Sequence, residues 1–170
     1  QNQKFENLIY KSAILIINAL KNKNKVMFCG NGGSCADSEH LCAELVGRYL
    51  KNRKPYSAIS LTTNSSLLTA LSNDFSFVEI FKKQIEAIGK KNDVLFAITT
   101  SGKSKNILNA IKIAKKNKIK VILLTSKKAI SLKKKVDIFI PVPSDRVDRI
   151  QEMHIAIGHI ICELVENCIN

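Results

Sequence analysis

The sequence has no tryptophan, only three prolines and no cysteine pair at C-x-x-C spacing. Its five cysteines are an odd number without paired spacing, which favours reduced thiols over a zinc module. No apolar run approaches the roughly 20 residues that a membrane-spanning helix needs. The first residues show no basic-then-apolar leader either. The 170 residues, 45% of them apolar, are therefore expected to form one globular domain, with no membrane partner.

Arginine is also scarce, although the net charge is +13. Nearly all of the positive charge is lysine, scattered over expected helix faces and turns, with no aromatic residues interleaved as stacking platforms. This pattern does not favour nucleic acid as a partner. It suits a general attraction for small anionic substrates instead.

The order of the expected elements indicates the fold. Apolar residues at helical spacing predict a helix over residues 4–22. Short apolar strands then alternate with helices from residue 25 to residue 140, and a long helix closes the chain. Alternation of this kind predicts a parallel sheet with helices on both faces. The fold class is therefore expected to be α/β, a three-layer αβα sandwich with a flavodoxin-like parallel sheet plus the N-terminal helix.

The first candidate site is the loop "GNGGS", residues 30–34, which follows the first strand. Its amides could form a nest for an anion, with Ser34 as N-cap of a helix over about 35–50 and Asp37 completing a capping-box-like pair. The loop is not G-x-G-x-x-G, and the next strand ends without the acidic residue that would hold a ribose. A tight strand-to-helix turn without a ligand stays open as the alternative.

The second candidate site is "AITTSGKSKN", residues 97–106, which comes close to a phosphate-binding P-loop. Ala97 stands where the first glycine belongs, and the next strand ends without a magnesium-binding aspartate. A cluster of hydroxyls at a helix N-terminus fits a phosphate monoester better. Its members are Thr99, Thr100, Ser101 and Ser104. A simple capped turn is the other alternative.

The third candidate site combines two segments far apart in the sequence. His40 and Glu44 share a helix face at i, i+4, although such a pair also occurs on ordinary helix surfaces. Gln151 and His159 lie eight residues apart on the last helix, roughly 80° apart around its axis. Two imidazoles, a carboxylate and an amide could coordinate a divalent metal. His154 is expected to point elsewhere.

These stretches, with "CGNGGSCADSEHLCAELVGRY", "SNDFSF" and "DRIQEMHIAIGHIICELVE", resemble the bacterial phosphoheptose isomerases, a branch of the SIS-domain proteins. The resemblance runs from the first helix to the last. It implies a single SIS domain over residues 1–170 that converts sedoheptulose 7-phosphate to D-glycero-D-manno-heptose 7-phosphate for lipopolysaccharide or capsule. It further implies a cytoplasmic homotetramer with sites built from more than one subunit, and the helix over 4–22 is expected in its interface.

The resemblance also implies roles for individual residues. One Zn²⁺ per subunit would lie on His40, Glu44, Gln151 and His159, and Glu44 with His159 would form the acid–base pair. The substrate contacts would be Asn31, Gly32, Gly33, Glu44, Asn73, Asp74, Thr99, Thr100, Ser101, Ser104 and Gln151. We add Ser34 from the first loop, and Asp148, one turn before Gln151, to the expected contacts.

Two questions stay open at this level. The sequence does not decide whether Glu44 acts chiefly as metal ligand or as base, because a carboxylate bound to zinc is a weaker base. A non-catalytic SIS protein, either a phosphosugar-binding regulator or a replication-initiation adaptor, is the rival reading. The full set of four metal and acid–base residues favours the enzyme.

Overall fold

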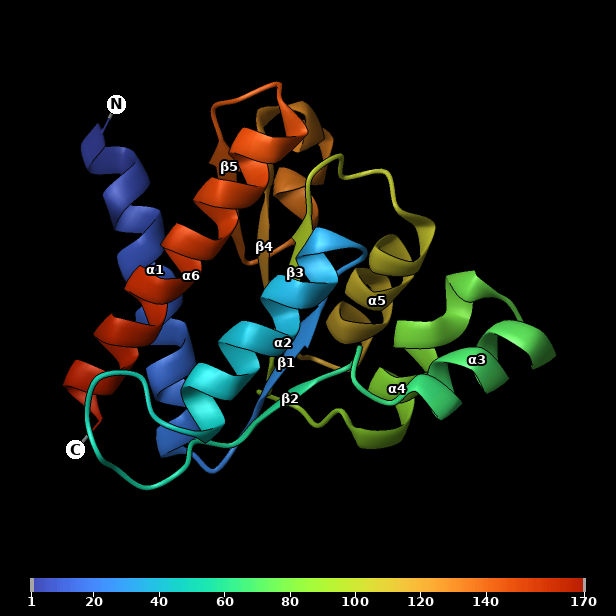
Figure 1. The fold of residues 1–170 in the computed structure, drawn as a ribbon, viewed down its shortest axis with the longest axis horizontal. Coiled ribbons are helices and arrows are strands. Elements are labelled where there is room, and N and C mark those ends of the chain that lie inside the picture. The colour runs from blue at the N-terminus through green and yellow to red at the C-terminus, as the bar shows by residue number, and fades with distance from the viewer. Residues whose placement is uncertain (1, 170) are drawn as a thin grey trace.

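A sheet of five parallel strands, in the order β2-β1-β3-β4-β5, forms the centre of the computed structural model, which describes residues 2–169 (Figure 1). The strands are β1 (Val26–Cys29), β2 (Ala58–Ser60), β3 (Val94–Thr99), β4 (Lys120–Ser126) and β5 (Ile138–Val142). β3 lies in the middle, and every one of its residues is buried. Strands buried on both faces read as continuous apolar runs, which confirms the predicted α/β sandwich.

Helices cover both faces of this sheet (Figure 1). One face packs against α1 (Asn2–Lys21), α2 (Gly33–Val46) and α6 (Val147–Cys168). The other packs against α4 (Ile80–Ile88), α5 (Lys105–Lys116) and the 3₁₀ segment η2 (Lys127–Lys135). α3 (Ser65–Asp74) and the short η1 (Phe77–Glu79) connect β2 to α4. Within the described residues, none of the helices is both long enough and apolar enough to cross a bilayer.

Two details of the sequence-based prediction are wrong. The helix α2 begins at Gly33, because Gly32 occupies the N-cap position with φ +59°, and it ends at Val46. That left-handed backbone favours glycine. Ser34 therefore lies inside the first turn, is buried and caps nothing. The lysine-rich segment η2 was not predicted, because no element was assigned between the strands now seen as β4 and β5.

A polar cluster lies buried between α6 and the end of β4. His154 is fully buried, and neither ring nitrogen has a hydrogen-bond partner of regular geometry. The hydroxyls of Thr125 and Ser126 are likewise buried without partners. Burial lowers the pKa of His154 from its ordinary value of 6.5 to about 4, against a smaller opposing effect of the Thr125 backbone. The imidazole is therefore neutral in the folded chain at physiological pH.

This histidine should make folding sensitive to acid. The unfolded chain takes up a proton at His154 below about pH 6.5, whereas the folded chain resists it until about pH 4. Stability is therefore full above pH 6.5 and falls by about 3 kcal/mol on the way to pH 4. Denaturant unfolding across this range should show the loss in the wild type, and His154→Gln should remove it.

The comparison with the variant matters because Asp37 acts in the opposite direction. Burial raises the pKa of Asp37 to about 6, only partly offset by His40, so its protonation favours the folded state as the pH falls. The difference between wild type and His154→Gln isolates the histidine. Equal pH slopes for the two proteins would contradict the assignment.

Candidate functional site

The candidate site lies along the seam between α2 and α6. The two helices approach closely at two glycines, one on each helix. A β-carbon on Gly158 would lie 2.5 Å from Leu41, and one on Gly33 would lie 2.2 Å from the amide nitrogen of Gln151. Neither position tolerates a larger side chain without movement. The close separation of the two helices therefore depends on these two glycines, and it lets polar groups from both helices meet.

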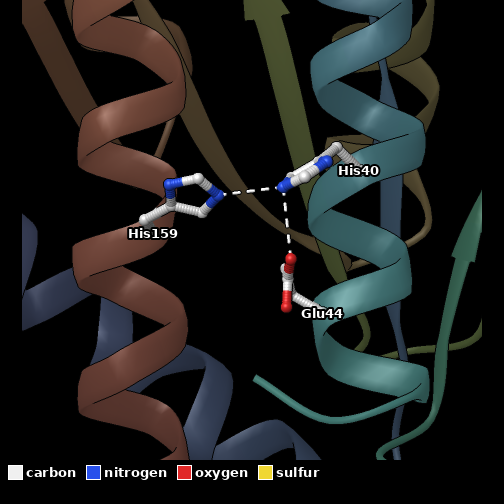
Figure 2. Close-up of side chains that lie close together, drawn as sticks. All are labelled: His40, Glu44 and His159. Carbon is white, nitrogen blue, oxygen red and sulfur yellow. Dashed lines mark hydrogen bonds and ion pairs between the residues drawn. The ribbon is translucent and has the colours of Figure 1, made fainter. Parts of the chain in front are cut away.

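Three of these groups converge on one point (Figure 2). The Nε2 atoms of His40 and His159 are 3.0 Å apart, and His40 Nε2 lies 3.2 Å from Glu44 Oε1. One ligand atom from each of the three lies within 4.8 Å of the others. The structure thus brings His40 and Glu44 together with His159, 119 residues away from His40.

The donor set fits a divalent metal. Two imidazole nitrogens bound to one tetrahedral zinc at about 2.0–2.1 Å would lie roughly 3.3 Å apart, close to the separation seen between the two Nε2 atoms. Two histidines and a glutamate form a ligand set that zinc uses in catalytic sites with an open position. The side chain of His40 is half exposed and that of Glu44 is 19% exposed, so solvent and small ligands reach the cluster.

The neighbours of the cluster hold its rings and extend it along the seam. The ring of Tyr49 stacks on His159, with 5.6 Å between centroids and 26° between planes. Gln151 lies about two turns before His159 on α6, with its amide against the backbone of Gly33. The expected fourth ligand is thus on the same seam, at the N-terminal end of α2.

The first glycine loop is tied to the second by a pair of amides. Asn31 donates from Nδ2 to Asn106 Oδ1 at 2.9 Å, and Asn106 returns a hydrogen bond of 2.8 Å to Asn31 Oδ1. Asn106 is buried in the first turn of α5. Ser34 offers little to a ligand, since its side chain is buried and its amide donates to the Asn31 carbonyl.

The hydroxyl loop after β3 leaves donors free. Thr99 and Ser101 accept hydrogen bonds from the amides of Gly102 and Lys103, which shape the turn. Ser104 is the N-cap of α5, yet its hydroxyl makes no capping hydrogen bond. Gly102 has φ +65°, and a β-carbon there would lie 2.4 Å from that of Ala129. The turn therefore presents hydroxyls at the positive end of a helix, as an anion site requires.

Three expected contacts lie apart from this cluster in the single chain. Asn73 and Asp74 are at the end of α3, hydrogen-bonded to each other and exposed. Figure 1 shows α3 on the opposite side of the molecule from α6. Asp148 is exposed in the first turn of α6 and pairs with Arg146 at 2.5 Å. Sequence reasoning grouped these residues with the site. In the single chain Asn73 and Asp74 on α3 are remote from it, whereas Asp148 lies on α6, one turn before Gln151.

Sequence reasoning also missed residues that support the site. Asn106 is one; the others are Arg53 and Glu166, which form a buried ion pair at 2.9 Å behind the cluster. Arg53 was one of only four arginines, and that scarcity was the one available hint. A buried partner 113 residues away has no local sequence pattern.

Comparisons with known proteins agree with this geometry. Residues 2–126 match the SIS domain family. The chain is 49% identical over 158 residues to a phosphoheptose isomerase of Nitratiruptor sp., covering 93% of this chain and 84% of the relative. It is 45% identical over 164 residues to that of Helicobacter pylori (strain P12), covering 96% and 85%. The chain belongs to the phosphoheptose isomerase family of SIS-domain proteins.

Solved structures of the family have the same fold. The phosphoheptose isomerase from Francisella tularensis superposes with a TM-score of 0.91 at 37% identity, covering 95% of this chain and 86% of that one. The one from Neisseria gonorrhoeae gives 0.89 at 36% identity, covering 98% and 91%. The family resemblance identified from the motifs is therefore confirmed along nearly the whole chain.

Metal binding at the seam is directly testable. His40→Ala and His159→Ala each remove one nitrogen from the cluster, so the affinity for Zn²⁺ should fall on the order of 100-fold. Competition with a chromogenic chelator measures this affinity. His154→Gln is the matched control, because this histidine lies on α6 but outside the cluster, and it should bind zinc as the wild type does. Unchanged affinity in His159→Ala would rule the seam out.

Proposed function

We propose that this chain is an aldose–ketose isomerase that converts D-sedoheptulose 7-phosphate to D-glycero-D-manno-heptose 7-phosphate. The observation that carries the proposal is the cluster of His40, Glu44 and His159 at 3.0–3.2 Å, in a chain about half identical to named phosphoheptose isomerases. We expect the product to serve as a precursor of the heptose in lipopolysaccharide or capsule.

The reaction moves a proton between C1 and C2 of the sugar through an enediol. It needs a base that takes the proton from C1 and returns it to C2, and a group that moves a proton between the two oxygens. We assign the proton transfer between the two carbons to Glu44 and the proton transfer between the two oxygens to His159. Their side chains face one another across the seam from α2 and α6, as Figure 2 shows.

The other end of the substrate meets the loops at the carboxyl ends of β1 and β3. Thr99, Thr100, Ser101 and Ser104 offer hydroxyls to the phosphate, supported by the N-terminus of α5. Gly32, Gly33 and Asn31 line the start of α2, where Gln151 can bind the sugar hydroxyls. Ser34 is left out of the proposed contacts, because its side chain is buried and its amide already donates to the Asn31 carbonyl.

Zn²⁺ is the proposed metal, held by His40, Glu44 and His159 with Gln151 as a fourth ligand. When bound, it would supply Lewis-acid stabilisation of the charge that develops on the sugar oxygens. His40 serves only as ligand in this assignment. Glu44 would then have two tasks, as ligand and as base, and a carboxylate bound to zinc is the weaker base.

We further propose that the active unit is a cytoplasmic homotetramer with composite sites. The position of Asn73 and Asp74 away from the seam supports this, because a second copy can bring them to it. Tyr10 on α1 and Met153 and Ile160 on α6 are exposed apolar side chains. These side chains suit helices that pack against other copies, with the helix over 4–22 in the interface.

Replacing Glu44 tests the assignment of the base. Glu44→Gln should abolish turnover of sedoheptulose 7-phosphate, followed by NMR of the product with and without zinc, while the unfolding midpoint stays near that of the wild type. Glu86→Gln on α4, across the sheet, is the control and should remain fully active. Retained activity in Glu44→Gln would remove this residue from the mechanism. Binding without turnover in the wild type would favour a phosphosugar-binding regulator.

The contact between Gly33 and Gln151 gives a second test. In Gly33→Ala the new methyl group displaces only the flexible end of Gln151, so the chain should fold while turnover falls roughly 10-fold. In a Gln151→Ala background the same change should cost nothing further, because the displaced group is already absent. Additive losses in this double-mutant cycle would show that Gly33 acts independently of Gln151.

A further inference from the structure

A buried carboxylate lies two turns beyond His159 on α6. The side chain of Glu166 is 2% exposed, and both of its oxygens are fully used as acceptors. Oε2 accepts from the amides of Leu50 and Lys51 at 2.7 and 2.9 Å, and Oε1 accepts from Tyr49 N at 3.2 Å and Arg53 Nε at 2.9 Å. Burial alone would raise the pKa of Glu166, but these four donors outweigh it and hold the pKa below its ordinary value.

Arg53 connects this carboxylate to the end of α2. The last carbonyls of a helix have no partners within the helix, and a cation beside them is favoured by the helix dipole. Arg53 fills this role, because Nη2 donates to the carbonyl of Glu44 at 2.7 Å and Nη1 donates to that of Leu45 at 2.9 Å. Nη1 also reaches the carbonyls of Gly47 and Lys54, and the guanidinium stacks on Tyr56.

The two residues thus join both sides of the reactive cluster. Glu44 is held through its own backbone by Arg53, and Arg53 is held by Glu166. Glu166 also binds the amide of Tyr49, whose ring stacks on His159. These contacts lead back to α6, since His159 and Glu166 lie seven residues apart on one face of that helix. Nothing in this path requires Arg53 or Glu166 to touch a substrate.

We propose that Arg53 and Glu166 are positioning residues, which fix the separation of Glu44 and His159 and the orientation of the His159 ring through Tyr49. The proposal rests on the isomerase function above for its kinetic test alone. A lysine at position 53 keeps the charge but lacks the planar fork, so it cannot reproduce the bonds to Glu44, Leu45 and Glu166 together.

Two variants and one matched control test the proposal. Glu166→Gln places an amide group where an acceptor is needed, and Arg53→Lys removes the fork. Each should lower kcat roughly 10- to 100-fold, as small displacements of reacting groups do, with KM little changed. The control is Asp93→Asn, which breaks another buried carboxylate that accepts two backbone amides, from Lys25 before β1 and Lys90 before β3. It should lower the unfolding midpoint similarly and leave kcat unchanged.

A second measurement is independent of turnover. In NMR spectra of the metal-free protein, the ring protons of His159 should carry an upfield shift from the stacked Tyr49, assigned with Tyr49→Leu. This shift should be lost in Glu166→Gln and Arg53→Lys and kept in Asp93→Asn. Unchanged kcat and shift in the two variants, or an equal kcat loss in the control, would overturn the proposal. If the wild type does not convert the sugar, the proposed function fails and the shift alone decides the positioning role.

Discussion

The close approach of α2 and α6 is the constraint on which the candidate site depends. Gly158 leaves room for Leu41, and Gly33 leaves room for Gln151, so the helices lie near enough for His40 and His159 to touch. Both helices also cover the same face of the sheet, which fixes their direction. The backbones of α2 and α6 at this seam are therefore rigid, because any shift of either helix must disturb the core beneath it.

Much of the fold could be predicted from local patterns. Continuous apolar runs indicated strands buried on both faces, and 3.6-residue periodicity indicated the helices between them. Part of the site could also be predicted from local sequence, because His40 and Glu44 share a face of one helix and the hydroxyl loop follows directly after a strand. Parallel strands bring such ends to one edge of the sheet, and there the Asn31–Asn106 pair joins the two loops.

The remaining features depend on tertiary contacts that leave no local trace. Ser34 matched the preferred chemistry of an N-cap, but the left-handed backbone of Gly32 moved the start of α2 and buried the serine. Arg53 and Glu166 lie far apart in sequence and meet only because α6 returns beside the end of α2. Asn73 and Asp74 show the reverse, since motif similarity assigned them to a site that one chain does not complete.

The central claim is that a base on this seam carries a proton from C1 to C2 of the sugar phosphate. Isomerisation in deuterium oxide tests it most directly, with the product examined by NMR. Glu44 is partly exposed, so a proton held there can exchange with solvent before it returns. The account predicts deuterium at C2 of the aldose heptose phosphate. A product that retains only protium at C2 would contradict the account, because a base in contact with solvent exchanges its proton, whereas direct hydride transfer from C1 does not.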